Sequence, residues 1–132
     1  MTGKRGFTLI EVVVVMAIIV IAIGLVGPRI GAGLGRLEMN TAAQTTRGMI
    51  RLARLQAQRT EKPQYIVFDR SRRVVTLVND EMRATRESKL PSSIDIVLEG
   101  DARTAALFVT PSGLVRGTTV RFRSGEREVV FP

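Results

Sequence analysis

The sequence predicts an α+β protein in which a long N-terminal helix, apolar at first and amphipathic later, packs on an antiparallel β-sheet. Three observations indicate this class. Residues 7–27 carry a single charge, residues 36–60 repeat small and apolar side chains at helical spacing, and the chain beyond Pro63 alternates β-rich runs with turn residues.

The apolar segment begins at Phe7, directly after two basic residues and a glycine. At about 1.5 Å per helical residue, its length approaches the thickness of a bilayer's hydrocarbon core. Apolar side chains occupy every side, so no polar face remains to lie on water. We therefore expect a membrane helix. An ordinary secretory signal peptide is the alternative, although such an apolar run is usually shorter and residues 22–24 make a poor cleavage site.

Glu11 is the one charge in this segment. A carboxylate at membrane depth commonly costs a few kcal/mol. One interpretation places its side chain at the headgroup boundary, because Glu11 lies only about 6 Å into the segment. The other pairs it with a cation inside the membrane. Cleavage between Gly6 and Phe7 would free an α-amino group on Phe7, which could reach the Glu11 of a neighbouring, staggered helix.

The run Lys4-Arg5-Gly6-Phe7-Thr8-Leu9-Ile10-Glu11 resembles the class III signal of type IV pilins and type II secretion pseudopilins. The resemblance implies that a prepilin peptidase cleaves after Gly6 and methylates Phe7. It also implies that Glu11 is needed for assembly and that Pro28 kinks the helix. The product would be a single-pass protein of the cell inner membrane, with its C-terminal domain in the periplasm.

These expectations divide the chain into four parts. They are a cleaved leader (1–6), a transmembrane and filament-core helix (7–28), an extension of that helix (29–62) and an antiparallel sheet domain (63–132). Proline and internal glycine weaken helices, so Pro28 and the glycine-rich run 31–35 predict either a linker or a long helix that bends or melts there. The resemblance to pilins implies the second, a weak helix with local melting.

The helical extension has two distinct faces from about Arg36 to Thr60. Arg47, Arg51 and Arg54 share one face, which is either solvated or in contact with a partner or nucleic acid. A different face is expected to pack on the sheet, and comprises Met39, Ala42, Ala43, Thr46, Met49, Ile50, Ala53 and Ala57. The helix is expected to end at residues 61–63, because Pro63 disfavours helical geometry in the residue before it.

Six strands are expected after Pro63, at 64–69, 73–79, 94–98, 105–110, 118–123 and 127–131. Residues 70–72 form a charged turn between the first two strands, which predicts a hairpin. The polar segment 80–93 has no clear period and is expected to be a loop.

Two further stretches are similar to the GspH/FimT group, which contains the H-type minor pseudopilin of type II secretion and a related minor pilin. They are the helix-to-strand junction of residues 52–69 and the segment 107–113 followed by Gly117. The resemblance implies a minor pseudopilin of a periplasmic pseudopilus that drives protein export. Its partners would be the major and other minor pseudopilins, the prepilin peptidase and the inner-membrane assembly platform. Two departures concern Ser112, where an acidic residue is common, and the C-terminal end, where members often continue. The second puts in doubt any partner or DNA contact at that end.

The charge of the chain leaves a second function open. Net charge is +8, of which +7 falls after Pro28, and arginine outnumbers lysine 17 to 3. Codon bias is one explanation, and an anionic partner is the other. Arg116, Arg121, Arg123 and Arg127 are the candidate contacts of a minor pilin that binds DNA for uptake. A signal-anchored periplasmic binding domain that is never cleaved is a third hypothesis.

Catalysis is not expected. The chain contains no histidine and no cysteine, so it lacks a Ser-His pair, a thiolate nucleophile and the commonest metal ligands. No glycine-rich phosphate loop follows a strand. We therefore expect no enzyme activity, cofactor or metal.

Overall fold

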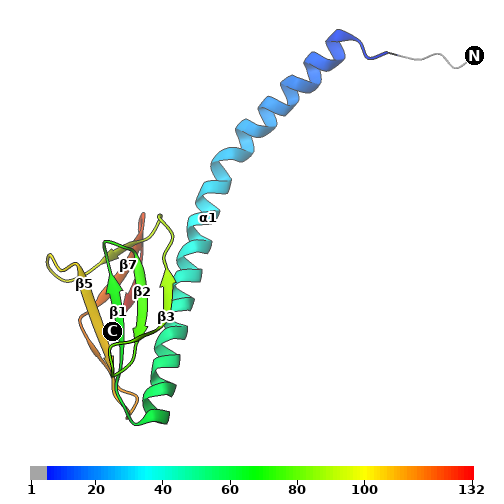
Figure 1. The fold of residues 1–132 in the computed structure, drawn as a ribbon. Coiled ribbons are helices and arrows are strands. Elements are labelled where there is room, and N and C mark those ends of the chain that lie inside the picture. Colours follow the sequence, from blue (N-terminus) through cyan, green and yellow to red (C-terminus); the bar gives the residue numbers. More distant parts are fainter. Residues whose placement is uncertain (1–5) are drawn as a thin grey trace, which may run out of the picture. The chain divides into compact units, whose positions relative to one another are not determined.

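The computed structural model of the chain describes residues 6–132, apart from the side chains of residues 26–32. Within these residues one helix, α1 (Leu9–Thr60), precedes eight strands (Figure 1). The chain divides into two compact units, Met1–Leu34 and Gly35–Pro132, and α1 contributes to both. Every strand pair is antiparallel, which confirms the α+β class expected from the sequence.

In the second unit, α1 packs one face against the strands. All eight residues predicted for this face are buried, and Ala53 and Ala57 are fully inaccessible to solvent. Alanine at these positions lets the helix backbone approach the strands closely, while Met49 and Ile50 fill the space beside them. The prediction of the core face from helical periodicity is therefore confirmed.

The helix ends where the sequence predicts. The hydroxyl of Thr60 donates to the carbonyl oxygen of Gln56 (2.8 Å), one helical turn earlier. Glu61 then adopts a positive φ of 54°, the left-handed conformation that commonly closes a helix. Pro63 follows and leads into the first strand.

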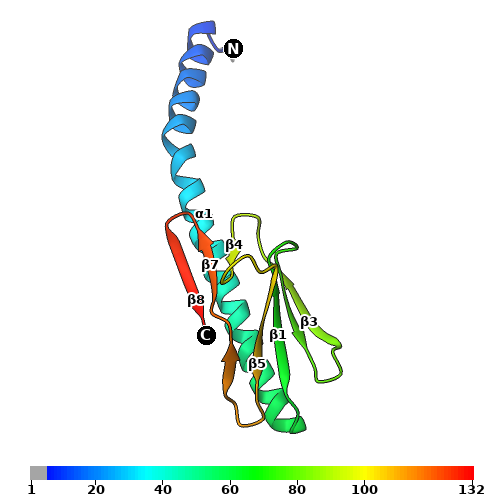
Figure 2. The ribbon, with the colours of Figure 1, turned by 90° about the vertical axis from the view of Figure 1, so that its left-hand side faces the viewer.

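The strands form two sheets rather than one (Figure 2). The five-stranded sheet has the order β3-β2-β1-β5-β6, and the three-stranded sheet has the order β4-β7-β8. Their bounds are β1 (Gln64–Asp69), β2 (Val74–Val78), β3 (Ala84–Lys89), β4 (Asp95–Val97), β5 (Thr104–Val109), β6 (Val115–Gly117), β7 (Val120–Ser124) and β8 (Arg127–Phe131).

All six expected strands are present, with bounds shifted by two residues at most. The expectation of a loop over 80–93 is wrong, because β3 lies within this segment and pairs with β2. β3 reads ATRESK and is exposed along nearly its whole length at the sheet edge, so it needs no alternation of apolar residues. The short strand β6 is a second omission, since three residues carry too little pattern to reveal it.

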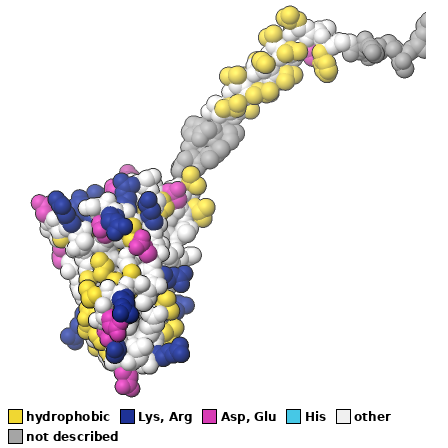
Figure 3. Space-filling view, in the orientation of Figure 1, with side chains coloured by type: hydrophobic (Ala, Val, Ile, Leu, Met, Phe, Trp, Pro, Cys, Tyr) yellow, Lys and Arg dark blue, Asp and Glu magenta, His cyan; other side chains and the backbone are white. Residues whose placement is uncertain are grey.

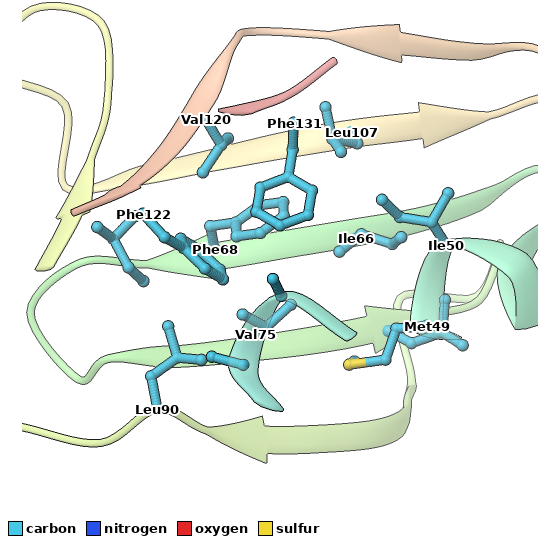
Figure 4. Packing of buried hydrophobic residues seen from close by; sticks show 14 of the residues in the cluster. Met49, Ile50, Ile66, Phe68, Val75, Leu90, Leu107, Val120, Phe122 and Phe131 are labelled. Atoms are coloured by element: carbon cyan, nitrogen blue, oxygen red, sulfur yellow. The ribbon is translucent and has the colours of Figure 1, made fainter. Parts of the chain in front are cut away.

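An aromatic cluster joins the two sheets through the core. The ring centroids of Phe122 and Phe131 lie 4.8 Å apart, and Phe68 of β1 lies 6.1 Å from Phe122 and 6.5 Å from Phe131 (Figure 4). Tilted and edge-on contacts of this kind are favourable beyond the area that they bury. All three rings belong to the same buried cluster as Met49 and Ile50 of α1, so helix and both sheets share one core.

Substitution by alanine should change the stability of this unit in opposite directions at two glycines, Gly117 and Gly48. Gly117 has a φ of +149°, and an added Cβ would lie 2.5 Å from the carbonyl oxygen of Ala106, so Gly117→Ala should lower the free energy of unfolding by about 1–3 kcal/mol. Gly48 is helical and an added Cβ would meet nothing within 4 Å. Gly48→Ala should therefore raise the free energy of unfolding by about 0.5–1 kcal/mol. Urea titrations followed by circular dichroism measure both; an unchanged or stabilised Gly117→Ala variant would contradict the close pairing of β5 and β6.

Candidate assembly segment and basic surfaces

The start of α1 places Glu11 in its first turn. The carbonyl oxygen of Thr8 accepts hydrogen bonds from the backbone N–H groups of Glu11 (3.0 Å) and Val12 (3.3 Å). Thr8 therefore occupies the N-cap position, and Glu11 is the third residue of the helix. A carboxylate here is stabilised by the positive end of the helix dipole.

The residue types at the start of α1 also match a known pattern of helix beginnings. Thr8 and Glu11 match the spacing of a capping box, in which a threonine N-cap precedes a glutamate by three residues. Phe7 and Val12 occupy the positions of a hydrophobic staple and line the same groove. The capping-box spacing could have been read from the sequence, as Thr-x-x-Glu before an apolar run.

The groove beside Glu11 is apolar along its length. Its volume is about 340 Å³, and its lining residues are Phe7, Glu11, Val12, Val15, Met16 and Ile19. Phe7 and Leu9 are each 83% exposed, and the large apolar residues of α1 up to Leu25 are all at least 48% exposed. Figure 3 shows hydrophobic side chains projecting along both visible edges of this segment. A surface of this kind requires lipid or protein to cover it.

Several expectations for this segment fall outside what the structure describes. These are the leader residues 1–5, the kink at Pro28 and most of the glycine-rich run 31–35 with its local melting. Across residues 6–25 and 33–132, no helix has the length and hydropathy needed to cross a membrane.

The four arginines predicted to contact an anionic partner do not share one face. Arg116 pairs with Phe108 across β5 and β6, on the face of the five-stranded sheet opposite to the buried Leu107 and Val109. Arg127 lies at the start of β8, on the same face as Phe131.

Arg121 and Arg123 do lie together, on the outer face of the three-stranded sheet. They alternate with the buried Val120 and Phe122 along β7. Acidic side chains flank them on this face: the Nε atom of Arg121 lies 3.6 Å from the carboxylate of Glu128, and Asp95 of β4 is opposite Arg123. Their positive charge is therefore partly compensated within the chain.

Arg47, Arg51 and Arg54 of α1, unlike the four arginines of the strands, lie together without an acidic neighbour in the groove that they line. All three are exposed and line a single groove beside the end of β8. No acidic residue lines this groove. The shared arginine face expected from helical spacing is confirmed.

A polar cavity of about 580 Å³ lies at the C-terminal end of α1. Lys62 and Asp80 form an ion pair across it, with Nζ and Oδ2 2.8 Å apart. The hydrogen bond from Lys62 lowers the pKa of Asp80, and the same bond raises the pKa of Lys62. The cavity is lined by Gln56, Arg59, Thr60, Lys62, Gln64, Asn79, Asp80 and Thr85.

Comparison with known proteins gives one match. Residues 1–27 match the family model described as the prokaryotic N-terminal methylation motif. No curated protein and no solved structure is similar enough to be matched. The match supports a type IV pilin-like protein with prepilin-type processing and N-terminal methylation, and it links the N-terminal segment to membrane anchoring.

The Lys62–Asp80 pair predicts a pH-dependent contribution to stability. Because the pKa of Asp80 is lowered by folding, the contribution is present above the carboxyl's ordinary pKa and is lost as pH falls through the lowered value. Asp80→Asn should therefore melt at a slightly lower temperature than the wild type at pH 7. The difference should vanish in acid. A difference that persists unchanged at low pH would show that the ionised carboxylate is not its source.

Proposed function

We propose that this chain is a minor pseudopilin of a type II secretion system, which assembles into a periplasmic pseudopilus that drives protein export. The observation that carries the proposal is the N-terminal segment itself: the methylation motif over residues 1–27 leads into a helix whose apolar surface is exposed on all sides. Such a segment is built to be covered, first by lipid and then by identical segments of other subunits.

Processing would complete the segment. Cleavage after Gly6 exposes the α-amino group of Phe7, two residues before α1 begins at Leu9. Methylation of this amine leaves it able to carry a positive charge. The new ammonium and Glu11 then give each helix one cation and one anion near its start, in an otherwise apolar surface.

The two charges would set the stagger of the filament. An unpaired carboxylate in an apolar environment is costly, so helices that slide until an ammonium meets a neighbour's Glu11 remove that cost. A register set by one buried charge pair is specific, because most other offsets leave both charges unpaired. The capping geometry at Thr8 supports this role, since it holds Glu11 in the first helical turn.

The proposed location and partners follow from the same mechanism. The precursor sits in the inner membrane as a single-pass protein, meets the prepilin peptidase there, and passes to the assembly platform. Its second unit, Gly35–Pro132, lies in the periplasm and contacts the major and other minor pseudopilins. The sequence features shared with the GspH/FimT group favour a minor subunit.

The alternative, a minor pilin that binds DNA for uptake, receives less support. Of its four candidate contacts, Arg121 and Arg123 face nearby carboxylates, while Arg116 and Arg127 lie on other sheet faces. It remains a prediction that follows from the charge of +8.

Two substitutions at Glu11 separate assembly from helix capping. Glutamine serves in a capping box as glutamate does, but it carries no charge. Under the proposal, Glu11→Gln and Glu11→Leu should both insert in the membrane and both lose incorporation into filaments, by about tenfold or more. The measurement is the amount of the variant in sheared or purified filaments, relative to its amount in the membrane fraction.

Thr8→Ser is the matched control, because it retains the cap hydroxyl beside an unchanged Glu11. It should assemble as the wild type does. Normal incorporation of Glu11→Gln would overturn the charge-pairing mechanism and leave Glu11 with the capping role alone.

A further inference from the structure

A groove with an unusual composition runs between α1 and the end of β8. Its volume is about 300 Å³. Arginine side chains form one wall, β8 forms the other, and apolar residues lie between them. The lining comprises Arg47, Ile50, Arg51, Arg54, Val130, Phe131 and Pro132.

The arginine wall is a row on one flank of the helix. Arg47, Arg51 and Arg54 are four and three residues apart, a spacing that stacks side chains along one side. The stem of Arg54 lies over the β5–β6 turn, since a Cβ added to Gly113 in that turn would lie 3.4 Å from its Cγ. Figure 3 shows basic side chains along the edge of this unit where α1 lies.

The charge of this row is not compensated within the described part of the chain. The ion pairs found there involve Arg83 and Arg121 with nearby glutamates and Lys62 with Asp80, and none involves the groove. Three guanidinium groups beside one another favour a ligand that carries several negative charges.

The β8 wall offers unpaired backbone groups. β8 is the last strand of the order β4-β7-β8, and only β7 pairs with it. The two-residue turn at 125–126 makes Ser124 and Arg127 a hydrogen-bonded pair, so alternate residues of β8 direct their backbone groups to β7. The N–H and C=O groups of Glu128 and Val130 therefore point to the free edge. None of the additional backbone hydrogen bonds in the described residues reaches them.

Apolar surface completes the groove. Ile50 and Phe131 are buried and form its floor, and Val130 is 57% exposed at its rim. An exposed valine on an open sheet edge is the type of surface to which another strand adds. The groove thus combines a hydrogen-bonding edge, an apolar floor and a cationic wall.

We propose that this groove binds an extended, acidic segment of a partner protein, which adds as a further strand beside β8. In such a strand alternate side chains point to the same face, so every second residue would face α1 and meet the arginine row. The partner segment therefore carries Asp or Glu at alternate positions with apolar residues between them. The open edge favours a peptide over a nucleic acid, because an extended peptide presents N–H and C=O groups at the same spacing as those of β8.

The test uses the full chain in a non-ionic detergent and a fluorescent nine-residue peptide that alternates glutamate and valine. Binding is measured by fluorescence anisotropy at low and at physiological salt. The double variant Arg47→Glu/Arg51→Glu should weaken binding by roughly tenfold or more, since two attractive contacts become repulsive. The control is Arg72→Glu/Arg86→Glu, which makes the same charge change at exposed positions outside the groove and should bind within about twofold of the wild type.

A second pair of variants tests strand addition separately from charge. Val130→Pro removes an N–H group from the free edge and should abolish most of the binding, whereas Val130→Ala keeps that group and should retain it. Circular dichroism and melting temperature establish that each variant is folded. Equal binding by Val130→Pro and Val130→Ala would overturn the proposal, as would equal loss in both arginine pairs.

Two competing occupants are further outcomes of the same experiment. A single-stranded oligonucleotide that displaces the peptide and binds more tightly would overturn the proposal in favour of a polyanion site. Concentration-dependent self-association that the Arg47→Glu/Arg51→Glu variant abolishes would also overturn it, in favour of a second copy of the chain. All of these readouts are independent of filament assembly, so they can fail without affecting the function proposed above.

Discussion

The structure depends on a property of the α-helix: its backbone N–H and C=O groups pair within the helix. These groups therefore stay paired whether the side chains around them face lipid, water or a protein core. α1 uses this freedom twice. Up to Leu25 its apolar residues are exposed on all sides, whereas in the second unit it buries a single face of small and apolar residues. One element can therefore serve an apolar environment at its start and a globular core at its end.

The second unit follows from the buried face of α1. Two sheets are joined by the Phe68, Phe122 and Phe131 rings and share their core with the helix, so neither sheet needs to bury its apolar face alone. The outer strands remain as edges with different properties. β3 is charged and exposed, which discourages pairing, while β8 ends in Val-Val-Phe beside the arginine row. The edge at β8 is the one at which we propose that a partner strand adds.

Much of this fold could be predicted from the sequence, because buried residues recur at the spacing of the helix or strand that contains them. The eight residues of the α1 core face and all six expected strands follow from periods of 3.6 and 2. β3 and β6 could not be found that way, since an exposed edge strand and a three-residue strand have no buried alternation. The division into two sheets is also invisible to local patterns, because it depends on which strands pair across the core.

The candidate site was predictable in part. The motif around Phe7 and Glu11 could be recognised in the sequence. The groove at β8 could not, because it forms only where α1 and β8, which are distant in sequence, come together in the fold. Glu11 lies in the first turn of its own helix, and under the proposed function its carboxylate also pairs with the amine of a neighbour, which requires cleavage. Mass spectrometry of the protein isolated from its native membrane tests this most directly. The account predicts a chain that begins at Phe7 and carries one added methyl group; a chain that retains Met1, or one that begins beyond Val26, would contradict it.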